Sequence, residues 1–212
     1  MVNTFLVAPP SEKNGYKESA RYLDRQRLGK QRVEAYQILC LIEDLTYLAR
    51  KYKKPIPENC EKWREWIRKI SRIYKSKDYK FIVKEGRYIK ANKTLKRTDC
   101  EEGQRLVGLG FVFHPAVLMW LQWPEALKLY INSHIEVWVE QGYKNNMKLY
   151  EVQEEVEHPP WVYDENLIKN HRGALLKKEI DRDEPSHYQE IDIFLKAPKW
   201  NDYIWPLVNK EN

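Results

Sequence analysis

A long helical stretch with one apolar face constrains the fold of this chain more than any other feature. From Ser19 to about Arg50, apolar side chains recur every three to five residues, the spacing of one buried face of an α-helix. Gly29 interrupts the pattern at a cost of about 1 kcal/mol relative to alanine, so we expect a kink there or the close approach of another segment. The apolar face comprises Leu23, Leu28, Val33, Tyr36, Leu39, Ile42, Leu45 and Leu48.

The segment that follows this helix is strongly basic. Residues 51–97 contain 17 Lys or Arg and 5 Asp or Glu, a local charge of +12 in a chain whose total is +6. Within it, residues 61–76 predict a helix with Trp and Ile on one face and cations on the other. Residues 78–93 alternate around Glu85-Gly86, which indicates a short hairpin. We therefore expect a single domain, 1–212, with a basic α/β-hairpin insertion at about 51–105.

Helices are also expected in the rest of the chain. Pro115 and Pro124 each suit the first turn of a helix and Gly142 suits a C-terminal stop, which predicts helices at about 115–122 and 124–141. Asp164 suits the N-cap of a further helix, ENLIKNHRGALLKKEI. The aromatic tail, WNDYIWPLV, is expected to pack back onto the core. The sequence thus predicts a compact, mainly α-helical protein.

The first helix carries Arg25, Arg27, Lys30 and Arg32 within eight residues. Such a cluster is usually a solvated helix face, but the adjoining basic segment, in which Trp and Tyr alternate with cations, favours nucleic acid. Cations bind phosphates spaced along a backbone, and aromatic rings stack on exposed bases. The candidate nucleic-acid contacts are Arg21, Arg25, Arg27, Lys30, Arg32, His171 and Arg172. A partly buried core histidine is the alternative interpretation of His171.

Several classes of function lack support in the sequence. The three cysteines are widely spaced and no Cys/His cluster accompanies them, so neither a metal site nor a disulfide framework is expected. P-loop, dinucleotide-binding, zinc-protease and nucleophile-elbow motifs are missing. No stretch resembles a signal peptide or a membrane span. We expect a soluble, intracellular (cytoplasmic), monomeric protein without a cofactor or a membrane partner.

Three segments resemble the pyrimidine-dimer DNA glycosylase family, the endonuclease V type, and most closely its longer bacterial branch. The first is Asn3-Thr4-Phe5-Leu6 together with LDRQRLGKQRVEAYQIL (23–39). The second is HPAVLMWLQWPEALKLYINSHIEVWVEQGY (114–143). The third is PPWVYDENLIKNHRGALLKKEIDRDEPSHY (159–188) with the closing Trp205-Pro206. These segments cover most of the chain outside 51–105.

The resemblance implies a helical protein that binds duplex DNA and acts as a glycosylase and AP lyase on damaged or modified bases. In that family the N-terminal α-amine attacks the sugar and forms an imine, and no metal is needed. Here Val2 would supply the amine after removal of Met1. Arg27 and Arg32 fall near the family's two helix arginines, but residues 28–31, which are Leu-Gly-Lys-Gln, lack the catalytic glutamate that lies between them.

This departure leaves the catalytic groups open. Asp24 and Glu34 are the nearest carboxylates on the same helix, and Lys30 is an alternative amine nucleophile. A non-catalytic DNA-binding protein on the same scaffold is the second hypothesis. A third is an enzyme or binding protein for a small phosphorylated ligand, with the basic cluster as its anion site.

Overall fold

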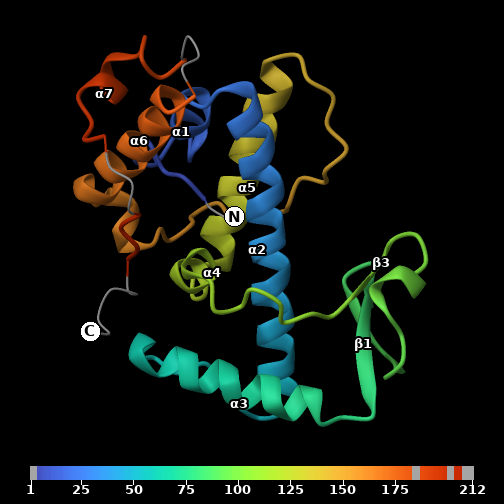
Figure 1. Ribbon diagram of the computed structural model, residues 1–212. Coiled ribbons are helices and arrows are strands. Elements are labelled where there is room, and N and C mark those ends of the chain that lie inside the picture. The colour runs from blue at the N-terminus through green and yellow to red at the C-terminus, as the bar shows by residue number, and fades with distance from the viewer. Residues whose placement is uncertain (1–3, 183–186, 200–202, 207–212) are drawn as a thin grey trace. The chain divides into compact units, whose positions relative to one another are not determined.

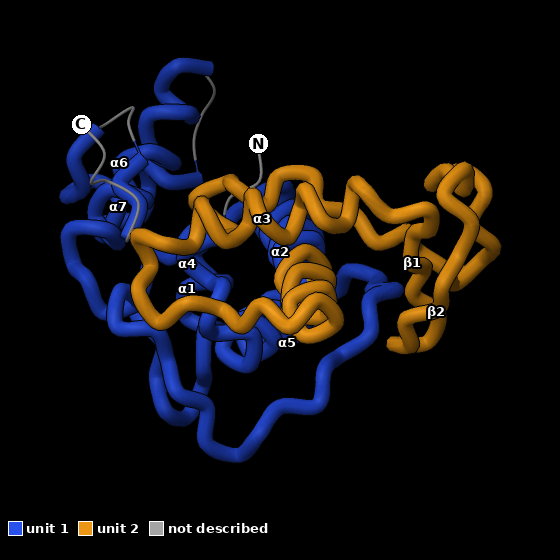
Figure 2. The backbone as a smooth tube through the Cα atoms, turned by 90° about the horizontal axis from the view of Figure 1, so that it is seen from below, with its two compact units in different colours: residues 1–39, 118–212 blue, residues 40–117 orange. Residues whose placement is uncertain are grey.

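The computed structural model describes residues 4–182, 187–199 and 203–206, which are mainly helical with one small antiparallel sheet (Figure 1). The chain divides into two compact units, residues 1–39 with 118–212, and residues 40–117 (Figure 2). The predicted insertion, 51–105, falls inside the second unit. No helix among the described residues is long and apolar enough to cross a membrane.

The first predicted helix is divided in two. A short helix, α1 (Lys17–Arg21), is followed by a break at residues 22–24, and α2 (Arg25–Lys51) then runs without interruption. The prediction of one helix from Ser19 was therefore wrong at its N-terminal end. Asp24 explains the restart, because its Oδ1 accepts a hydrogen bond from the Arg27 backbone N–H (2.8 Å), the arrangement of a helix N-cap.

The buried face of α2 also differs from the predicted one. Val33 and Tyr36 are each 40% exposed, whereas Gln31 is 1% exposed and Ala35 is fully buried. The buried positions of the N-terminal half are thus 28, 31, 35 and 38, spaced by three or four residues. The prediction placed its stripe on apolar residues alone and missed Gln31, a polar side chain in the middle of the buried face.

Three predicted helices are confirmed as α4 (Pro115–Trp120), which ends two residues earlier than expected, α5 (Pro124–Glu140) and α6 (Glu165–Ile180). The short helices η3 (Pro160–Tyr163) and α7 (Asp192–Leu195) of the first unit were not predicted. Asp164 caps α6 by accepting from the backbone N–H of Asn166 (2.8 Å). Gly142 adopts a φ of +83° directly after α5, as a C-terminal stop requires.

One hydrophobic cluster joins the N-terminal segment, α1, α2, α5, α6 and α7 in this unit. Its side chains are Phe5, Val7, Ala20, Leu23, Leu28, Val137, Leu175, Leu176, Tyr188 and Phe194. Tyr203, from the predicted aromatic tail, packs against this cluster. The cluster therefore fixes the start of the chain against the basic end of α2.

The second unit combines the C-terminal end of α2 with α3 and a sheet. The elements are η1 (Cys60–Lys62), α3 (Trp63–Lys75), β1 (Tyr79–Lys84), β2 (Arg87–Asn92), η2 (Arg97–Asp99) and β3 (Gln104–Leu106). The strand order is β2-β1-β3, all antiparallel. The hairpin turns at Glu85 (φ 50°) and Gly86 (φ 75°), two left-handed residues as a tight two-residue turn requires. The strand β3 was not predicted.

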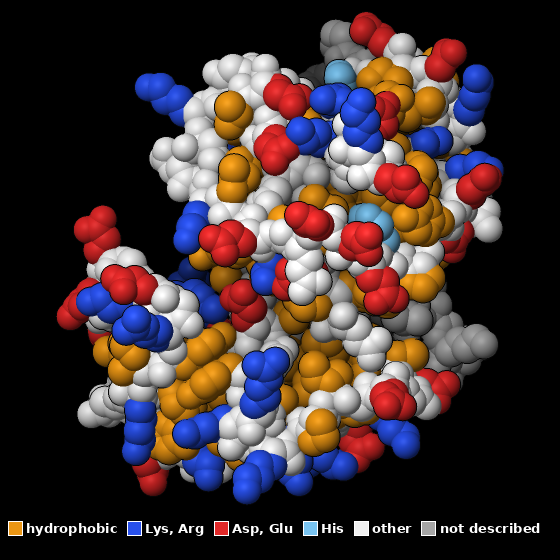
Figure 3. All heavy atoms as spheres, turned by 180° about the vertical axis from the view of Figure 1, so that it is seen from behind, with side chains coloured by type: hydrophobic (Ala, Val, Ile, Leu, Met, Phe, Trp, Pro, Cys, Tyr) orange, Lys and Arg blue, Asp and Glu red, His pale blue; other side chains and the backbone are white. Residues whose placement is uncertain are grey.

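A buried carboxylate ties α2 to the sheet within this unit. Both oxygens of Asp44 lie 2.7 Å from Nη1 of Arg105, and Asp44 also accepts from the Tyr88 hydroxyl (3.1 Å) and the Gly108 N–H (3.2 Å). On the outside, Lys and Arg side chains gather over α3 and the hairpin, with hydrophobic side chains between them (lower part of Figure 3). The basic charge of this segment is therefore displayed on its surface.

Candidate functional site

The segment Thr4–Val7 is buried although it belongs to no strand or helix. Buried backbone N–H and C=O groups need partners, and here side chains provide them. The Val7 N–H donates to the Ser19 hydroxyl (3.0 Å), and the Leu6 N–H donates to Nδ1 of His171 (3.1 Å). The start of the described chain is thus held by side chains from α1 and α6.

Gln31 holds the same segment from α2. Its Oε1 accepts from the Phe5 N–H at 2.7 Å. The hydroxyl of Tyr130, on α5, lies 2.8 Å from the Phe5 carbonyl oxygen and 3.0 Å from Gln31 Oε1. Nε1 of Trp120 donates to the Thr4 hydroxyl (2.8 Å). Three helices therefore meet at residues 4 and 5.

His171 and Arg172 serve this segment in different ways. His171 is 1% exposed, and burial lowers its pKa to about 4, so the ring is neutral and its Nδ1 acts as an acceptor. The side chain of Arg172 donates from Nε to the Val7 carbonyl oxygen (2.6 Å). As placed, His171 supports the N-terminal segment and does not reach a phosphate at the surface.

The cationic cluster of α2 divides between two sides of the helix. Arg25, Gly29 and Arg32 are four and three residues apart, so they share one side. Arg27, which precedes Gln31 by four residues and Glu34 by seven, lies on another side, about 200° away. The four cations therefore cannot form one row.

The side with Arg25 and Arg32 forms an open groove against α5. It has a volume of about 600 Å³ and is lined by Arg25, Gln26, Gly29, Lys30, Arg32 and Trp138. A Cβ at Gly29 would lie 3.1 Å from the Trp138 ring, so the glycine allows α5 to approach closely, one of the two outcomes expected at this position. Figure 1 shows α5 beside this half of α2.

Aromatic rings hold both arginines of this groove. The Arg32 guanidinium lies 4.1 Å from the Trp138 ring centroid, and Arg25 lies 4.8 Å from that of Tyr143. Arg32 also donates from Nη1 to Asn145 (3.0 Å), and burial lowers its pKa. Its buried Nε has no hydrogen-bond partner within the described part of the chain. The groove thus combines fixed cations with an aromatic wall, which suits a nucleic-acid backbone.

The opposite side of α2 faces Lys178, in the last turn of α6. The Lys178 ammonium lies 5.0 Å from the Phe5 ring centroid and donates a hydrogen bond to the Tyr203 hydroxyl. The pKa of Lys178 is lowered to about 8, first by burial and then by the positive charge of Arg27, while the charge of Glu34 opposes the shift. This side therefore gathers cations, a carboxylate and the N-terminal segment.

Asp24, a candidate catalytic carboxylate, has both oxygens engaged. Oδ1 caps α2, and Oδ2 accepts from the hydroxyl of the buried Tyr188 (2.8 Å). Glu34 is half-buried on the same side of α2 as Gln31 and influences the charge of Lys178. Of the two carboxylates, Glu34 is the one whose charge acts to raise the pKa values of Lys178 and Tyr130, two side chains that contact Phe5. Val2, the candidate nucleophile, lies outside the described residues.

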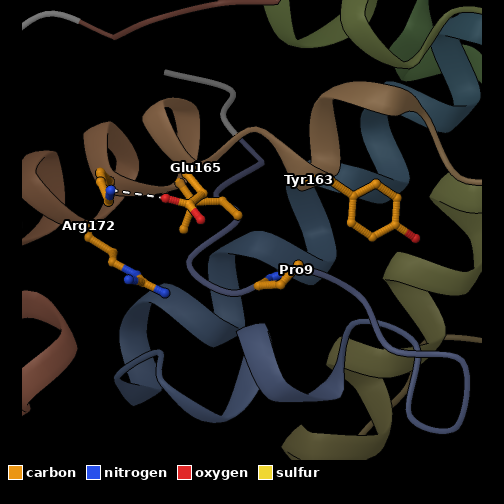
Figure 4. Close-up of a pocket in the computed structure, with 6 residues that line it drawn as sticks. Pro9, Tyr163, Glu165 and Arg172 are labelled. Atoms are coloured by element: carbon orange, nitrogen blue, oxygen red, sulfur yellow. Dashed lines mark hydrogen bonds and ion pairs between the residues drawn. The ribbon is translucent and has the colours of Figure 1, made fainter.

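The remaining predicted cations are engaged with other groups. Arg21 forms an ion pair with Glu140 (3.2 Å). Arg172 lines a separate pocket of about 350 Å³, and Figure 4 shows it across this pocket from Tyr163, on η3, whose ring points away from it. In the same pocket Lys169 pairs with Glu165 (3.1 Å), marked by the dashed line. Neither Arg21 nor Arg172 lines the Arg25–Arg32 groove.

Sequence reasoning missed Gln31, Tyr130, Trp138 and Lys178. The sequence did contain one indication for Gln31: it is a polar residue at a position that the helical repeat places on the buried face of α2. No local pattern marks Lys178, because a lysine in the last turn of a helix is an ordinary partner for the helix dipole. Its position beside Phe5 depends on a contact across 173 positions of the sequence.

The N-terminal segment, the basic helix and the groove all fall within the region that matches a known family. Residues 2–151 match the family model described as pyrimidine dimer DNA glycosylase. The chain belongs to this family. No curated protein and no solved structure matches the chain.

Membership of the pyrimidine dimer DNA glycosylase family confirms the predicted family and implies binding to DNA; the match covers the first two of the three sequence segments, and the third lies beyond it. The match includes α2 and α5, which form the cationic groove. It ends at residue 151, before α6 and the aromatic tail. His171, Arg172 and Lys178 therefore belong to the part of the chain that the family model does not cover.

Proposed function

We propose that this family member is a DNA glycosylase with AP-lyase activity, which excises damaged bases from duplex DNA through an imine at its N-terminal amine. The single observation that carries the proposal is the burial of Thr4–Val7 against the basic helix. Only Asn3 separates Val2 from Thr4, so the length of the chain keeps the Val2 amine within about 7 Å of Thr4. An α-amine has a pKa of about 7.7–8.0, so part of it is neutral and nucleophilic at pH 7.

In this proposal Glu34 is the catalytic carboxylate. Its carboxylate would stabilise positive charge on the sugar or accept the proton removed in strand cleavage. Asp24 is less suited, because the helix cap and Tyr188 engage both of its oxygens. We expect Glu34→Gln to remove strand cleavage while Asp24→Asn retains it. Retained cleavage in Glu34→Gln with loss in Asp24→Asn would reverse the assignment.

Phosphate binding is proposed for the cations that line the groove, Arg25, Lys30 and Arg32, and for Arg27 on the other side of α2. Trp138 would support Arg32 and offer its ring to an exposed base. We expect Trp138→Ala to weaken duplex binding, and the exposed Tyr163→Ala, on η3, to leave it unchanged. Equal affinities for the two variants would exclude the groove as the DNA contact.

Trapping with borohydride tests the reaction. A chain with a free N-terminus should give a covalent adduct with a UV-irradiated or an abasic duplex, because borohydride reduces an imine to a stable amine. Peptide mapping should place the adduct from the UV-irradiated duplex on Val2. The enzymatic proposal fails if neither duplex gives an adduct while duplex binding is retained.

A non-catalytic DNA-binding protein is the second candidate. Leu28 favours it, because this fully buried residue stands between the arginines where the resemblance leads us to expect a glutamate. This candidate predicts salt-dependent duplex binding, no strand cleavage and no effect of blocking the N-terminus. The trapping experiment separates the two.

The basic surface of the second unit is proposed as a further phosphate contact. Lys62, Arg72 and Lys75 are exposed on or next to α3. Each phosphate contact contributes about 0.9 to the slope of log affinity against log salt concentration. We expect a triple substitution of these residues by glutamine to reduce that slope by at most about 3. An unchanged slope would exclude this surface from DNA binding.

A further inference from the structure

Lys178 differs in its surroundings from the other lysines within residues 4–182, 187–199 and 203–206. Its ammonium lies between two aromatic rings, 5.0 Å from the Phe5 centroid and 5.1 Å from the Tyr203 centroid, and it donates to the Tyr203 hydroxyl. Among the residues that the structure describes, no carboxylate lies within ion-pair distance of it. Lys169, on the same helix, instead pairs with Glu165.

These surroundings make a neutral amine accessible near neutral pH. The pKa of Lys178 falls from an ordinary 10.5 to about 8, through burial and then through the charge of Arg27. At pH 7 roughly a tenth of such an amine is neutral, against a few parts in ten thousand for an ordinary lysine. Neutral lysine amines of this kind form imines with carbonyl compounds.

The location of Lys178 connects it to the proposed reaction. Phe5, whose ring contacts the ammonium, is fixed by Gln31 and Tyr130, so the amine lies against the N-terminal segment. Glu34 is near enough to influence its charge. An amine and a carboxylate are thus brought together at this segment by α6 and α2.

We propose that Lys178 is a second amine of this site, able to form an imine with the opened sugar of an abasic position in duplex DNA. This inference rests on the proposed function and adds to it a residue of α6, outside the family match. It differs from the earlier candidate, Lys30, which is exposed on α2 and lines the groove.

The chemistry balances without an oxidant or a reductant. The neutral Lys178 nitrogen attacks the aldehyde carbon C1′, and the resulting carbinolamine takes up a proton from solvent on its hydroxyl and loses water to give a protonated imine. Glu34 accepts a proton from C2′, and that electron pair forms the C2′=C3′ double bond. The C3′–O3′ bond breaks and its electrons leave with the phosphate. Water then hydrolyses the imine, which releases an unsaturated aldehyde and regenerates the lysine.

An N-terminally acetylated full-length chain isolates this amine from the α-amine. With an abasic duplex and borohydride, we expect this chain to form an adduct that peptide mapping places on Lys178. Adduct formation should rise with pH with a midpoint near 8. In the acetylated background, Lys178→Met should reduce trapping at least tenfold, whereas the matched control Lys177→Met should not.

The outcomes distinguish failure of the Lys178 proposal from failure of the proposed function. An adduct on the free N-terminus with none on the acetylated chain overturns the role of Lys178 and leaves the proposed function intact. An adduct of the acetylated chain at any other residue also overturns it. Absence of adduct in both chains overturns both proposals. Mapping on the unsubstituted acetylated chain keeps the test independent of whether Lys178→Met folds.

Discussion

The contact between Gln31 and the N-terminal segment gives the sharpest test of how this site is built. Gln31 is 1% exposed, and its Oε1 accepts from the Phe5 N–H at 2.7 Å. Methionine has nearly the same length and volume but offers no comparable acceptor. Gln31→Met should therefore leave the packing of α2 unchanged and leave a buried N–H without its partner.

The expected loss of stability follows from this single group. An unsatisfied buried N–H costs about 1–3 kcal/mol. Burying a thioether in place of an amide offsets part of this cost, because an apolar group transfers more easily from water. We expect a net decrease of about 1–2 kcal/mol in the free energy of unfolding. For a chain of this length the melting temperature should fall by roughly 2–8 °C.

Urea unfolding and hydrogen exchange measure the two consequences separately. The matched control is Gln37→Met, an exposed position on the same helix, which should unfold at the wild-type urea concentration. The Phe5 amide should exchange faster in Gln31→Met alone. Equal unfolding midpoints for the two variants, with unchanged protection of the Phe5 amide, would refute the idea that Gln31 holds the segment.

Three further predictions concern stability. Asp24→Ala should cost about 2 kcal/mol in urea unfolding, because it removes a helix cap and a partly buried hydrogen bond to Tyr188, and Asp24→Asn should cost less; equal losses would argue against capping. Asp44→Ala should cost near the lower end of the roughly 3–5 kcal/mol for breaking a buried ion pair, because the Arg105 side chain stays 26% exposed; a loss below about 1 kcal/mol in urea unfolding would contradict this. Burial lowers the pKa values of His134 and His171 to about 4, so the unfolded chain binds protons that the folded chain does not. The stability that the two neutral histidines contribute is fully present above about pH 6.5 and is lost as the pH falls toward 4, by at most roughly 3 kcal/mol for each histidine. Urea unfolding midpoints that stay constant between about pH 6.5 and 4 would contradict this prediction.

Local sequence signals predicted most of the elements correctly. These signals are proline at a first turn, Asp164 at an N-cap and Gly142 after a helix. Each acts on backbone groups within a few residues, so its effect can be predicted without knowledge of the tertiary structure. The hairpin at Glu85-Gly86 was predicted for the same reason. The strand β3 was missed because three residues carry too little pattern to distinguish a strand from a loop.

The positions of apolar residues alone did not predict correctly which side of α2 is buried. Val33 and Tyr36 looked like core positions, yet Gln31 and Ala35 occupy the buried face. A polar side chain can be buried when a partner satisfies it, and the partner here is the Phe5 N–H, 26 positions away. Sequence spacing does not contain that information.

The sequence by itself determined a mainly helical protein with a concentrated basic charge, and its motifs indicated the DNA glycosylase family that the comparison confirmed. These properties depend on residue type and short spacing. Helical spacing alone places the cationic cluster on more than one side of α2. Only the tertiary structure packed one of these sides against Trp138 of α5 and brought Lys178 to the N-terminal segment. The physical reason is that the chemistry of a site depends on which groups are removed from water and which groups lie close to one another. Packing between segments that are distant in the sequence decides both.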